Sequence, residues 1–295
     1  MKKVLVTGAN GLVGRAVALK LSDNTDLHYV VRDQSKALNC NGKIIVGDLH
    51  NINVFSEIER LAPDVIVHCA AQIPRSISGN DQSIYDYNNR IDQSIFSVVN
   101  ELGCWLIYFS STAVYGMNES LTEVAESSKT NRSSFYAAQK IDSEGWVTRN
   151  IKKGLILRIN APYDEVINES TVLGKFLNHA IEGSTLKYYG NGTRVQDFTN
   201  VLDIATLISH LIQEEKLKPG IFNISFGDPI NMKNLAELIV KLSKGESKIE
   251  SSGNVDPQEN YRAIYSIEKA KEELGWLPRI SLSEGIQKIL ENSSK

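Results

Sequence analysis

A tyrosine and a lysine four residues apart are the side chains in this sequence best suited to proton transfer. They stand in the segment Tyr136-Ala-Ala-Gln-Lys140, and on a helix this spacing places both on one face. The lysine ammonium would favour the phenolate form of the tyrosine by charge attraction. Lowering a tyrosine pKa from about 10 to near 7 takes about 4 kcal/mol, which the lysine and a positively charged cofactor could supply together. The pair therefore predicts a phenol that donates or accepts a proton at a substrate hydroxyl or carbonyl.

The spacing is not specific by itself, since Tyr265 and Lys269 repeat it near the C-terminus. The first pair is distinguished by the hydroxyl-rich segment Ser110-Ser-Thr112, which comes before it at the end of an apolar run. A hydroxyl at such a strand end could polarise the same carbonyl that Tyr136 would protonate. We therefore interpret the first pair as catalytic and the second as structural.

Three glycines near the N-terminus have the spacing of a dinucleotide-binding turn. They follow a short apolar run and precede a stretch with helical periodicity. The first glycine permits a tight turn, the second lets the backbone approach a pyrophosphate, and the third allows close helix–strand packing. Free N–H groups at the start of the helix would bind the phosphates. Because strand, turn and helix occur in the required order, a dinucleotide site is predicted here. Its expected residues are Gly8, Asn10, Gly11, Leu12, Val13 and Gly14.

The adenosine ribose should lie about 20 residues after the glycines, where Arg32 and Asp33 stand side by side. An acid at this place binds the 2′-hydroxyl of NAD, whereas an arginine accommodates the 2′-phosphate of NADP. If Arg32 is the first residue past the strand, NADP is favoured. If the strand ends one residue later, Asp33 takes this position and NAD is favoured. NADP has a slight preference. Asp48, followed by Leu49, could contact the adenine amino group or could equally form a turn.

Short apolar runs alternate with helical periodicity through the first half of the chain. These runs cover residues 4–6, 28–31, 44–46, 65–67, 106–109 and 155–157. They show little alternation of apolar and polar residues, as expected for strands buried on both faces. Strands that alternate with helices predict an α/β fold with a doubly wound parallel sheet of the Rossmann type.

The regularity weakens after about residue 161. The expected elements are a loop-rich stretch at 183–192, a helix near 202–214, a strand at 221–224, a helix at 235–242 and a polar loop at 245–257. We expect a dinucleotide-binding domain that spans residues 1–160 with about 197–225. A smaller, interleaved C-terminal domain would bind the substrate, and it spans residues 161–196 with about 226–295.

Composition narrows the class of protein. The 295 residues are 42% hydrophobic and 23% charged, as in ordinary globular proteins. A net charge of −3 without a basic cluster argues against nucleic-acid binding. Apolar runs are too short for a membrane span or a signal peptide. Three widely spaced cysteines fit neither a disulfide framework nor a metal site. A cytoplasmic protein is therefore expected.

These segments together resemble the extended short-chain dehydrogenase/reductases, the NAD-dependent epimerase/dehydratase proteins that act on nucleotide sugars. They occur in the family's order over nearly the whole chain. The segments that carry the resemblance are the three glycines, His68-Cys-Ala-Ala71, Ser110–Gly116, Tyr136-x-x-x-Lys140, Gly190–Asp203, Ser266–Ala270 and Leu274-Gly-Trp276-x-Pro278.

The resemblance implies roles for the matching residues. Tyr136 would be the general acid/base and Lys140 its ribose-binding partner. Ser111 would hydrogen-bond the substrate hydroxyl, with Ser110 and Thr112 as alternatives.

Further roles are implied around these residues. Asn88 or Asn89 would orient the active-site helix, and the apolar spacing nearby fits Asn88 better. Arg194 would meet the nucleotide diphosphate, and Arg262 is a second candidate that could equally be a solvated surface residue. The nicotinamide side would be lined by Ala70, Ala71 and Gln72. A homodimer through the helices that carry Asn88 and Tyr136 is also implied.

Departures from the family pattern narrow the chemistry. Where the 4,6-dehydratases carry an Asp-Glu pair, this chain has Thr112 and Ala113, which argues against dehydration. No cysteine occurs there, unlike in the reductases that also epimerise C3 and C5. A usual Gly-Pro turn is replaced by Asp164 and Glu165, and a usual arginine by Gln196, so the identity of the sugar stays open.

Three functions are then compatible with the sequence. The first is reduction of a 4-keto nucleotide sugar by NADPH, with Tyr136 as proton donor, and Arg32 favours it slightly. The second is 4-epimerisation with tightly held NAD. The third is a non-catalytic dinucleotide sensor on the same fold, against which the intact Ser111, Tyr136 and Lys140 argue.

Overall fold

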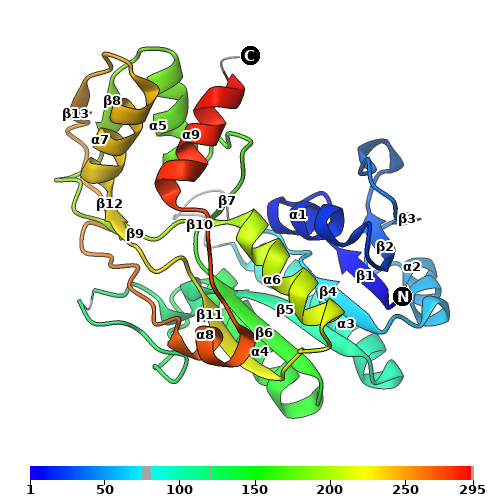
Figure 1. Ribbon diagram of the computed structural model, residues 1–295. Helices are drawn as coiled ribbons and strands as arrows, with labels where there is room; N and C mark the ends of the chain where they lie inside the picture. The colour runs from blue at the N-terminus through cyan, green and yellow to red at the C-terminus, as the bar shows by residue number, and fades with distance from the viewer. Residues whose placement is uncertain (75–80, 120, 294–295) are drawn as a thin grey trace.

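The computed structural model describes residues 1–74, 81–119 and 121–293. A seven-stranded sheet forms its centre (Figure 1), with the strand order β3-β2-β1-β4-β5-β6-β11 and every neighbouring pair parallel. The strands are β1 (Lys3–Thr7), β2 (Asp26–Val31), β3 (Lys43–Val46), β4 (Val65–His68), β5 (Trp105–Ser111), β6 (Gly154–Ile159) and β11 (Gly220–Ile224). Each predicted apolar run lies in one of these strands, and the predicted doubly wound α/β fold is confirmed.

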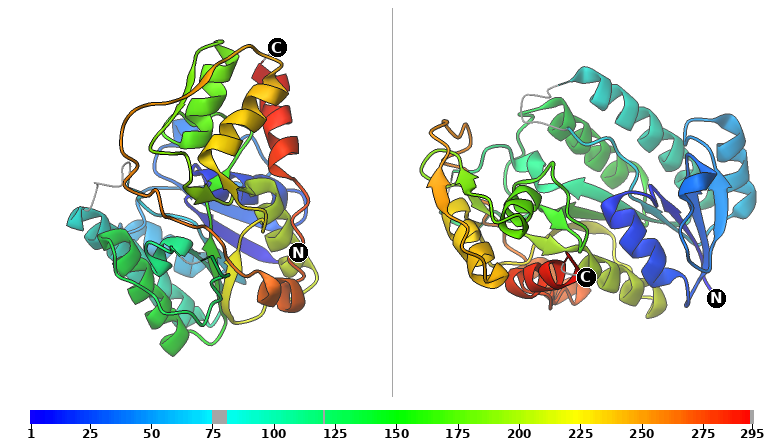
Figure 2. Two further views of the ribbon diagram at one scale, coloured as in Figure 1. Left: turned by 90° about the vertical axis from the view of Figure 1, so that its left-hand side faces the viewer. Right: turned by 90° about the horizontal axis from the view of Figure 1, so that it is seen from above.

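Helices cover both faces of this sheet, which is why its strands are apolar throughout. On one face, α1 packs beside α6; the opposite face is covered by α2, α3 and α4 (Figure 2, right). These helices are α1 (Leu12–Leu21), α2 (Ile52–Leu61), α3 (Gln82–Leu102), α4 (Phe135–Asn150) and α6 (Val201–Gln213). Within the described ranges, no helix has the length and apolar character needed to cross a membrane.

The order of strands reverses between β1 and β4, because the chain runs outward from β1 to β3 and then returns to β4 on the other side. Ligands of such sheets bind in the crevice at the carboxyl ends of the strands where this reversal occurs. Strand β1 ends at Thr7, directly before Gly8, and β4 ends at His68, directly before Cys69 and Ala70. The glycine turn and the loop after β4 therefore lie side by side at this crevice.

A smaller group of helices and short strands lies beyond one end of the sheet (Figure 1) and has a hydrophobic core of its own. Its elements are β7 (Pro162–Tyr163), α5 (Val172–Ile181), β8 (Leu186–Tyr188), β9 (Val195–Gln196), β10 (Thr199–Asn200), β12 (Ile230–Asn231), α7 (Met232–Ser243), β13 (Ile249–Ser251) and α9 (Leu282–Ser293). The loops predicted at 183–192 and 245–257 are wrong in part, since β8 and β13 lie in them and pair in parallel. Strands of three residues are too short to show an alternation of apolar and polar residues. In addition, β8 and β13 are about 60 residues apart in the sequence, so no local pattern indicates that they pair.

The segment that includes α8 (Glu268–Leu274) packs on the large sheet instead. Ala270, Leu274 and Trp276 belong to the core shared by α1 and α6. The indole N–H of Trp276 donates to the Ser225 carbonyl at 2.8 Å. The division into two domains stays a prediction, but this segment is better grouped with the sheet than with the smaller part.

Candidate active site

A cavity of about 640 Å³ opens at the carboxyl ends of β1, β2 and β4. Ten residues predicted for the dinucleotide site line it: Gly8, Asn10, Gly11, Arg32, Asp33, Asp48, Leu49, Ala70, Ala71 and Gln72. Seven further residues, which the sequence motifs do not single out, complete the lining: Val30, Val31, Lys36, Gly47, Cys69, Tyr87 and Ile91. In the sequence, these seven residues are marked only by lying near residues predicted for the site. They reach the cavity because separate strands, loops and helices meet there.

The glycine turn is shaped so that only glycine fits at two of its positions. Gly8 has a φ of +65°, and a Cβ there would lie 2.7 Å from the backbone of Ala70. A Cβ at Gly14 would lie 2.2 Å from the Gly8 carbonyl oxygen. No side chain caps α1, so the first N–H groups of this helix, which begins with Leu12, Val13 and Gly14, can serve an anion. This cradle fits the pyrophosphate of a dinucleotide.

The end of the cavity lined by Arg32, Asp33 and Asp48 carries charges of both signs. Strand β2 ends at Val31, so Arg32 is the first residue past it. The Asp33 carboxylate accepts from the Ser35 N–H at 2.9 Å, and hydrogen bonds from Ser35 lower the pKa of this acid. Asp48 accepts from the Tyr87 hydroxyl at 3.2 Å. The contacts of Arg32, Asp33 and Asp48 to ribose or adenine stay predictions.

Asn88 holds the loop that follows β4. Its side chain is fully buried, it accepts from the Gln72 N–H at 2.7 Å, and it donates to the Gln72 carbonyl at 2.9 Å. Asn89 is only half-buried. The structure therefore favours Asn88 over Asn89, and it places the side chain beneath the cavity loop, where it acts through Gln72.

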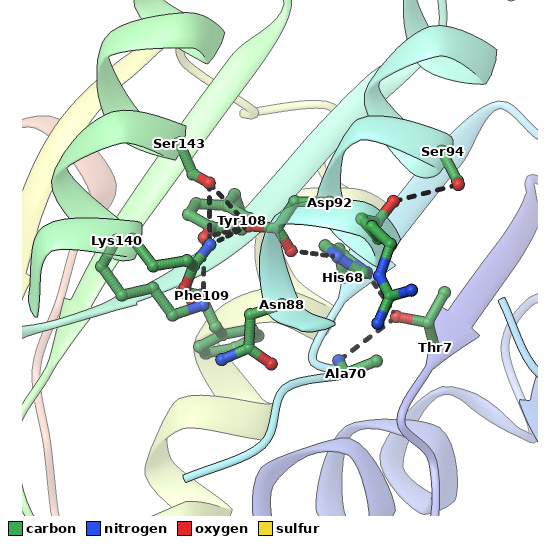
Figure 3. Close-up of polar contacts among 12 residues, drawn as sticks. Thr7, His68, Ala70, Asn88, Asp92, Ser94, Tyr108, Phe109, Lys140 and Ser143 are labelled. Atoms are coloured by element: carbon green, nitrogen blue, oxygen red, sulfur yellow. Dashed lines mark hydrogen bonds and ion pairs between the residues drawn. The ribbon is translucent and has the colours of Figure 1, made fainter. Parts of the chain in front are cut away.

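Tyr136 and Lys140 lie one turn apart at the start of α4. Ser134 caps this helix by accepting from the Ala137 N–H at 3.1 Å. The ammonium nitrogen of Lys140 lies 6.0 Å from the centre of the Tyr136 ring. It is buried and donates to the Tyr108 hydroxyl at 3.0 Å and to the Phe109 carbonyl at 2.9 Å (Figure 3).

These surroundings keep Tyr136 protonated at neutral pH. The pKa of Tyr136 is raised to about 12, chiefly by burial and in smaller part by the charge of Asp92, while Ser111 lowers it. That Lys140 and a positively charged cofactor together bring this pKa toward neutrality stays a prediction. Within the chain itself, the ammonium is engaged with Tyr108 and Phe109.

The three hydroxyls at the end of β5 have different surroundings. Ser110 donates to Glu144 at 2.5 Å, and Glu144 pairs with Arg158 at 2.6 Å in the interior. Thr112 is buried and donates to Asn160 at 3.1 Å. Ser111 is half-buried, its hydroxyl oxygen accepts from the Ala113 N–H at 3.1 Å, and it lies close enough to Tyr136 to lower the pKa of that phenol. The structure thus favours Ser111 over Ser110 and Thr112, whose hydroxyls donate to partners within the chain, and contact of any of the three with a substrate stays a prediction.

Arg194 and Arg262 bind groups of the chain itself. Arg194 donates to the Gln258 side chain at 3.0 Å and pairs with Asp256 at 3.4 Å. Arg262 donates to the carbonyls of Thr193 and Glu259 at 3.1 and 3.0 Å. Both hold the segments around residues 193 and 258 together, and contact of either with a diphosphate stays a prediction.

Replacing Ser111 with alanine should lower kcat by roughly 100-fold, the usual loss when one hydrogen-bond donor at a reacting oxygen is removed. The matched variant Thr112→Val removes a hydroxyl one residue away and should lower thermal stability while leaving kcat near that of the wild type. Steady-state kinetics and thermal unfolding of both variants test this. A larger kcat loss for Thr112→Val would contradict the assignment.

Comparison with known proteins agrees with this geometry. Residues 4–225 match the NAD dependent epimerase/dehydratase family. A putative UDP-glucose 4-epimerase of Methanocaldococcus jannaschii is 27% identical, over 97% of both chains. The structure of the UDP-glucose 4-epimerase of Thermotoga maritima with UDP-glucose superposes with a TM-score of 0.87 at 22% identity, covering 99% of this chain and 98% of that one. The structure of the UDP-glucuronic acid 4-epimerase of Bacillus cereus, in complex with UDP-glucuronic acid and NAD, superposes with a TM-score of 0.85 at 22% identity and covers 98% of each chain. The chain described here belongs to the NAD-dependent epimerase/dehydratase family.

Proposed function

We propose that this protein is a nucleotide-sugar 4-epimerase that keeps NAD bound through its catalytic cycle. The observation that carries the proposal is that Ser111, Tyr136 and Lys140 lie near one another at the carboxyl end of β5, the neighbour of strand β4, whose carboxyl end borders the dinucleotide cavity. The similarity of 4-epimerases over the full chain supports it. This proposal replaces the slight preference for a 4-keto reductase that Arg32 suggested.

The chemistry follows from the roles of the three side chains. A bound NAD would accept a hydride from C4 of the sugar, and its positive ring would favour the phenolate of Tyr136. Tyr136 would take the proton of the 4-hydroxyl, while Ser111 hydrogen-bonds the same oxygen. If the hydride and the Tyr136 proton returned to the other face of the rotated ketone, the product would be the C4 epimer, with no net change in the cofactor. Loss of water is disfavoured, because Thr112 and Ala113 offer no acid.

A 4-keto reductase that uses NADPH is the second candidate. Arg32 as the first residue past β2 favours it, since a guanidinium suits a 2′-phosphate. The neighbouring Asp33 opposes it, because hydrogen bonds keep the pKa of Asp33 low and the carboxylate charged at the same rim.

Identification of the dinucleotide that copurifies separates the two candidates. The protein is purified without added cofactor and denatured, and the released dinucleotide is identified by mass. We expect NAD at one molecule per chain and interconversion of UDP-sugar C4 epimers without added cofactor. A protein that holds no dinucleotide and then binds NADPH more tightly than NADH would overturn the proposal in favour of the reductase.

Two side-chain variants sharpen this experiment. Asp33→Ala should reduce the NAD retained during purification, whereas Arg32→Ala should leave it unchanged. The opposite order would identify Arg32 as the ribose contact. Homodimer formation through α3 and α4 also stays a proposal, which light scattering of the purified protein tests.

A further inference from the structure

A buried carboxylate, that of Asp92, lies between Lys140 on one side and His68 and Thr7 on the other (Figure 3). Asp92 of α3 is fully buried, and both of its oxygens are hydrogen-bonded. One oxygen accepts from three side chains at 2.6–2.7 Å: Tyr108, Gln139 and Ser143. The other meets His68 Nε2 at 2.9 Å. Burying a carboxylate at a core position of a helix costs folding free energy unless the charge is fully paired. Asp92 meets this condition, since four side chains contact its two oxygens.

One arm of this network reaches Lys140. The Tyr108 hydroxyl donates to Asp92 at 2.6 Å and accepts from the Lys140 ammonium at 3.0 Å. The same ammonium lies 4.5 Å from the centre of the Tyr108 ring. A single phenol thus bridges the lysine and the carboxylate, and it determines where the ammonium sits relative to Tyr136.

The other arm reaches the loop after β4. His68 Nδ1 lies 2.7 Å from the Thr7 hydroxyl oxygen, which accepts from the Ala70 N–H at 3.3 Å. With Asp92 ionised, one neutral tautomer satisfies the whole arm: Nε2–H donates to Asp92 and Nδ1 accepts from Thr7. Ala70 lines the dinucleotide cavity, so this arm ends at the cofactor site.

We propose that Asp92 is a positioning residue that holds the Lys140 ammonium through Tyr108 and the Ala70 loop through His68 and Thr7. One buried charge then aligns the proton-transfer pair with the cofactor loop. The proposal deepens the proposed function and rests on it, because it takes Tyr136 and Lys140 as the reacting pair.

The charges around Lys140 give the proposal an electrostatic signature. Groups that face its ammonium come from α3, α4, β5 and the loop after β4; they are Asp92, Glu144, Tyr136, Tyr108 and Cys69. Burial lowers the pKa of Lys140, and the charges of Asp92 and Glu144 raise it. Burial would raise the pKa of Asp92, but Lys140 and the hydrogen bond from His68 hold it below its usual range. Asp92 is therefore charged at neutral pH.

Removing the Asp92 charge should lower two pKa values at once. Lys140 would lose a stabilising negative charge, and Tyr136 would lose a charge that now opposes its phenolate. As the pH increases, the rate rises near the pKa of Tyr136, because turnover needs its phenolate. The rate falls near the pKa of Lys140, because turnover also needs its ammonium. Both limbs of the pH–rate profile should therefore move to lower pH.

Asp92→Asn tests this because it removes the charge and keeps the shape. The amide oxygen can accept the three donors, and its N–H₂ can donate to His68 Nε2 once the His68 proton moves to Nδ1. Carbon-13 NMR titration of tyrosine- and lysine-labelled protein reads both groups without any turnover, with Tyr136→Phe and Lys140→Arg used to assign the signals. We expect both signals, and both limbs of the kcat profile, to titrate at lower pH in Asp92→Asn. Unmoved titrations with a uniform fall in kcat would overturn the proposal.

A matched pair of variants tests the bridging role of Tyr108. Tyr108→Phe and Ser143→Ala each remove one buried hydroxyl that donates to the same oxygen of Asp92, but only Tyr108 also contacts Lys140. Tyr108→Phe should lose roughly 10- to 100-fold in kcat through a displaced ammonium, with NAD binding kept, and Ser143→Ala should lose neither. Equal losses in the two variants would mean that the network is only structural.

The failure of the two proposals can be told apart. Wild-type protein without epimerase activity contradicts the proposed function, whereas the NMR titrations of Asp92→Asn still decide whether Asp92 is coupled to Tyr136 and Lys140. Active wild-type protein with unmoved titrations contradicts the coupling alone.

Discussion

Tyr136→Phe should lower kcat by roughly 10²- to 10⁴-fold and leave dinucleotide binding intact. The substitution removes only the phenolic oxygen, so the ring keeps its place at the start of α4 and Lys140 keeps its bonds to Tyr108 and Phe109. Proton transfer by a positioned side chain contributes roughly 10²- to 10⁴-fold to rate, and a loss in this range is expected. The measurements are kcat for C4 interconversion of a UDP-sugar and the mass of dinucleotide retained after purification.

Tyr265→Phe is the matched control, because Tyr265 and Lys269 have the same spacing. The Tyr265 hydroxyl lies 2.7 Å from that of Tyr261, and Lys269 donates to the Ile221 carbonyl at 2.9 Å. Both contacts serve packing at the edge of the sheet, so this variant should retain turnover. Activity that survives in Tyr136→Phe, or that is lost equally in Tyr265→Phe, would disprove the catalytic assignment.

Gly8→Ala should destroy dinucleotide binding and destabilise the fold. A Cβ at Gly8 would lie 2.7 Å from the Cα and N of Ala70. These are backbone atoms of the adjacent loop, which also lines the cavity, so relief requires the glycine turn and the loop after β4 to separate. We expect no dinucleotide to be retained by the purified variant and a lower unfolding temperature.

Gly103→Ala separates crowding from backbone strain. Gly103 has a φ of +61°, close to the +65° of Gly8, and a Cβ there would meet nothing within 4 Å. The left-handed conformation costs a non-glycine residue about 1–2 kcal/mol at either position. Thermal unfolding and NAD titration should therefore show a modest stability loss with normal binding for Gly103→Ala. Equal effects of the two variants would show that contact with Ala70 is unimportant.

The sequence by itself determined the main sheet and the order of the site segments. Strands that are buried on both faces appear in the sequence as continuous apolar runs. These runs can be recognised without knowing which strands pair with one another. The glycine turn could be recognised from sequence because the strand before it and the helix after it are adjacent in the chain and show their own local patterns. The pairing of Tyr136 with Lys140 follows from helical geometry alone.

The tertiary structure decided what depends on contacts between distant segments. Parallel pairing of β8 with β13 joins residues too far apart for a period to reveal. Three adjacent hydroxyls look equivalent in sequence, and only the packing of Glu144 and Asn160 separates Ser111 from the other two. The pKa of Tyr136 likewise depends on burial and on Asp92. Local periodicity specifies which face of an element is buried, but burial of charge and the partner of each polar group arise only when separate elements meet.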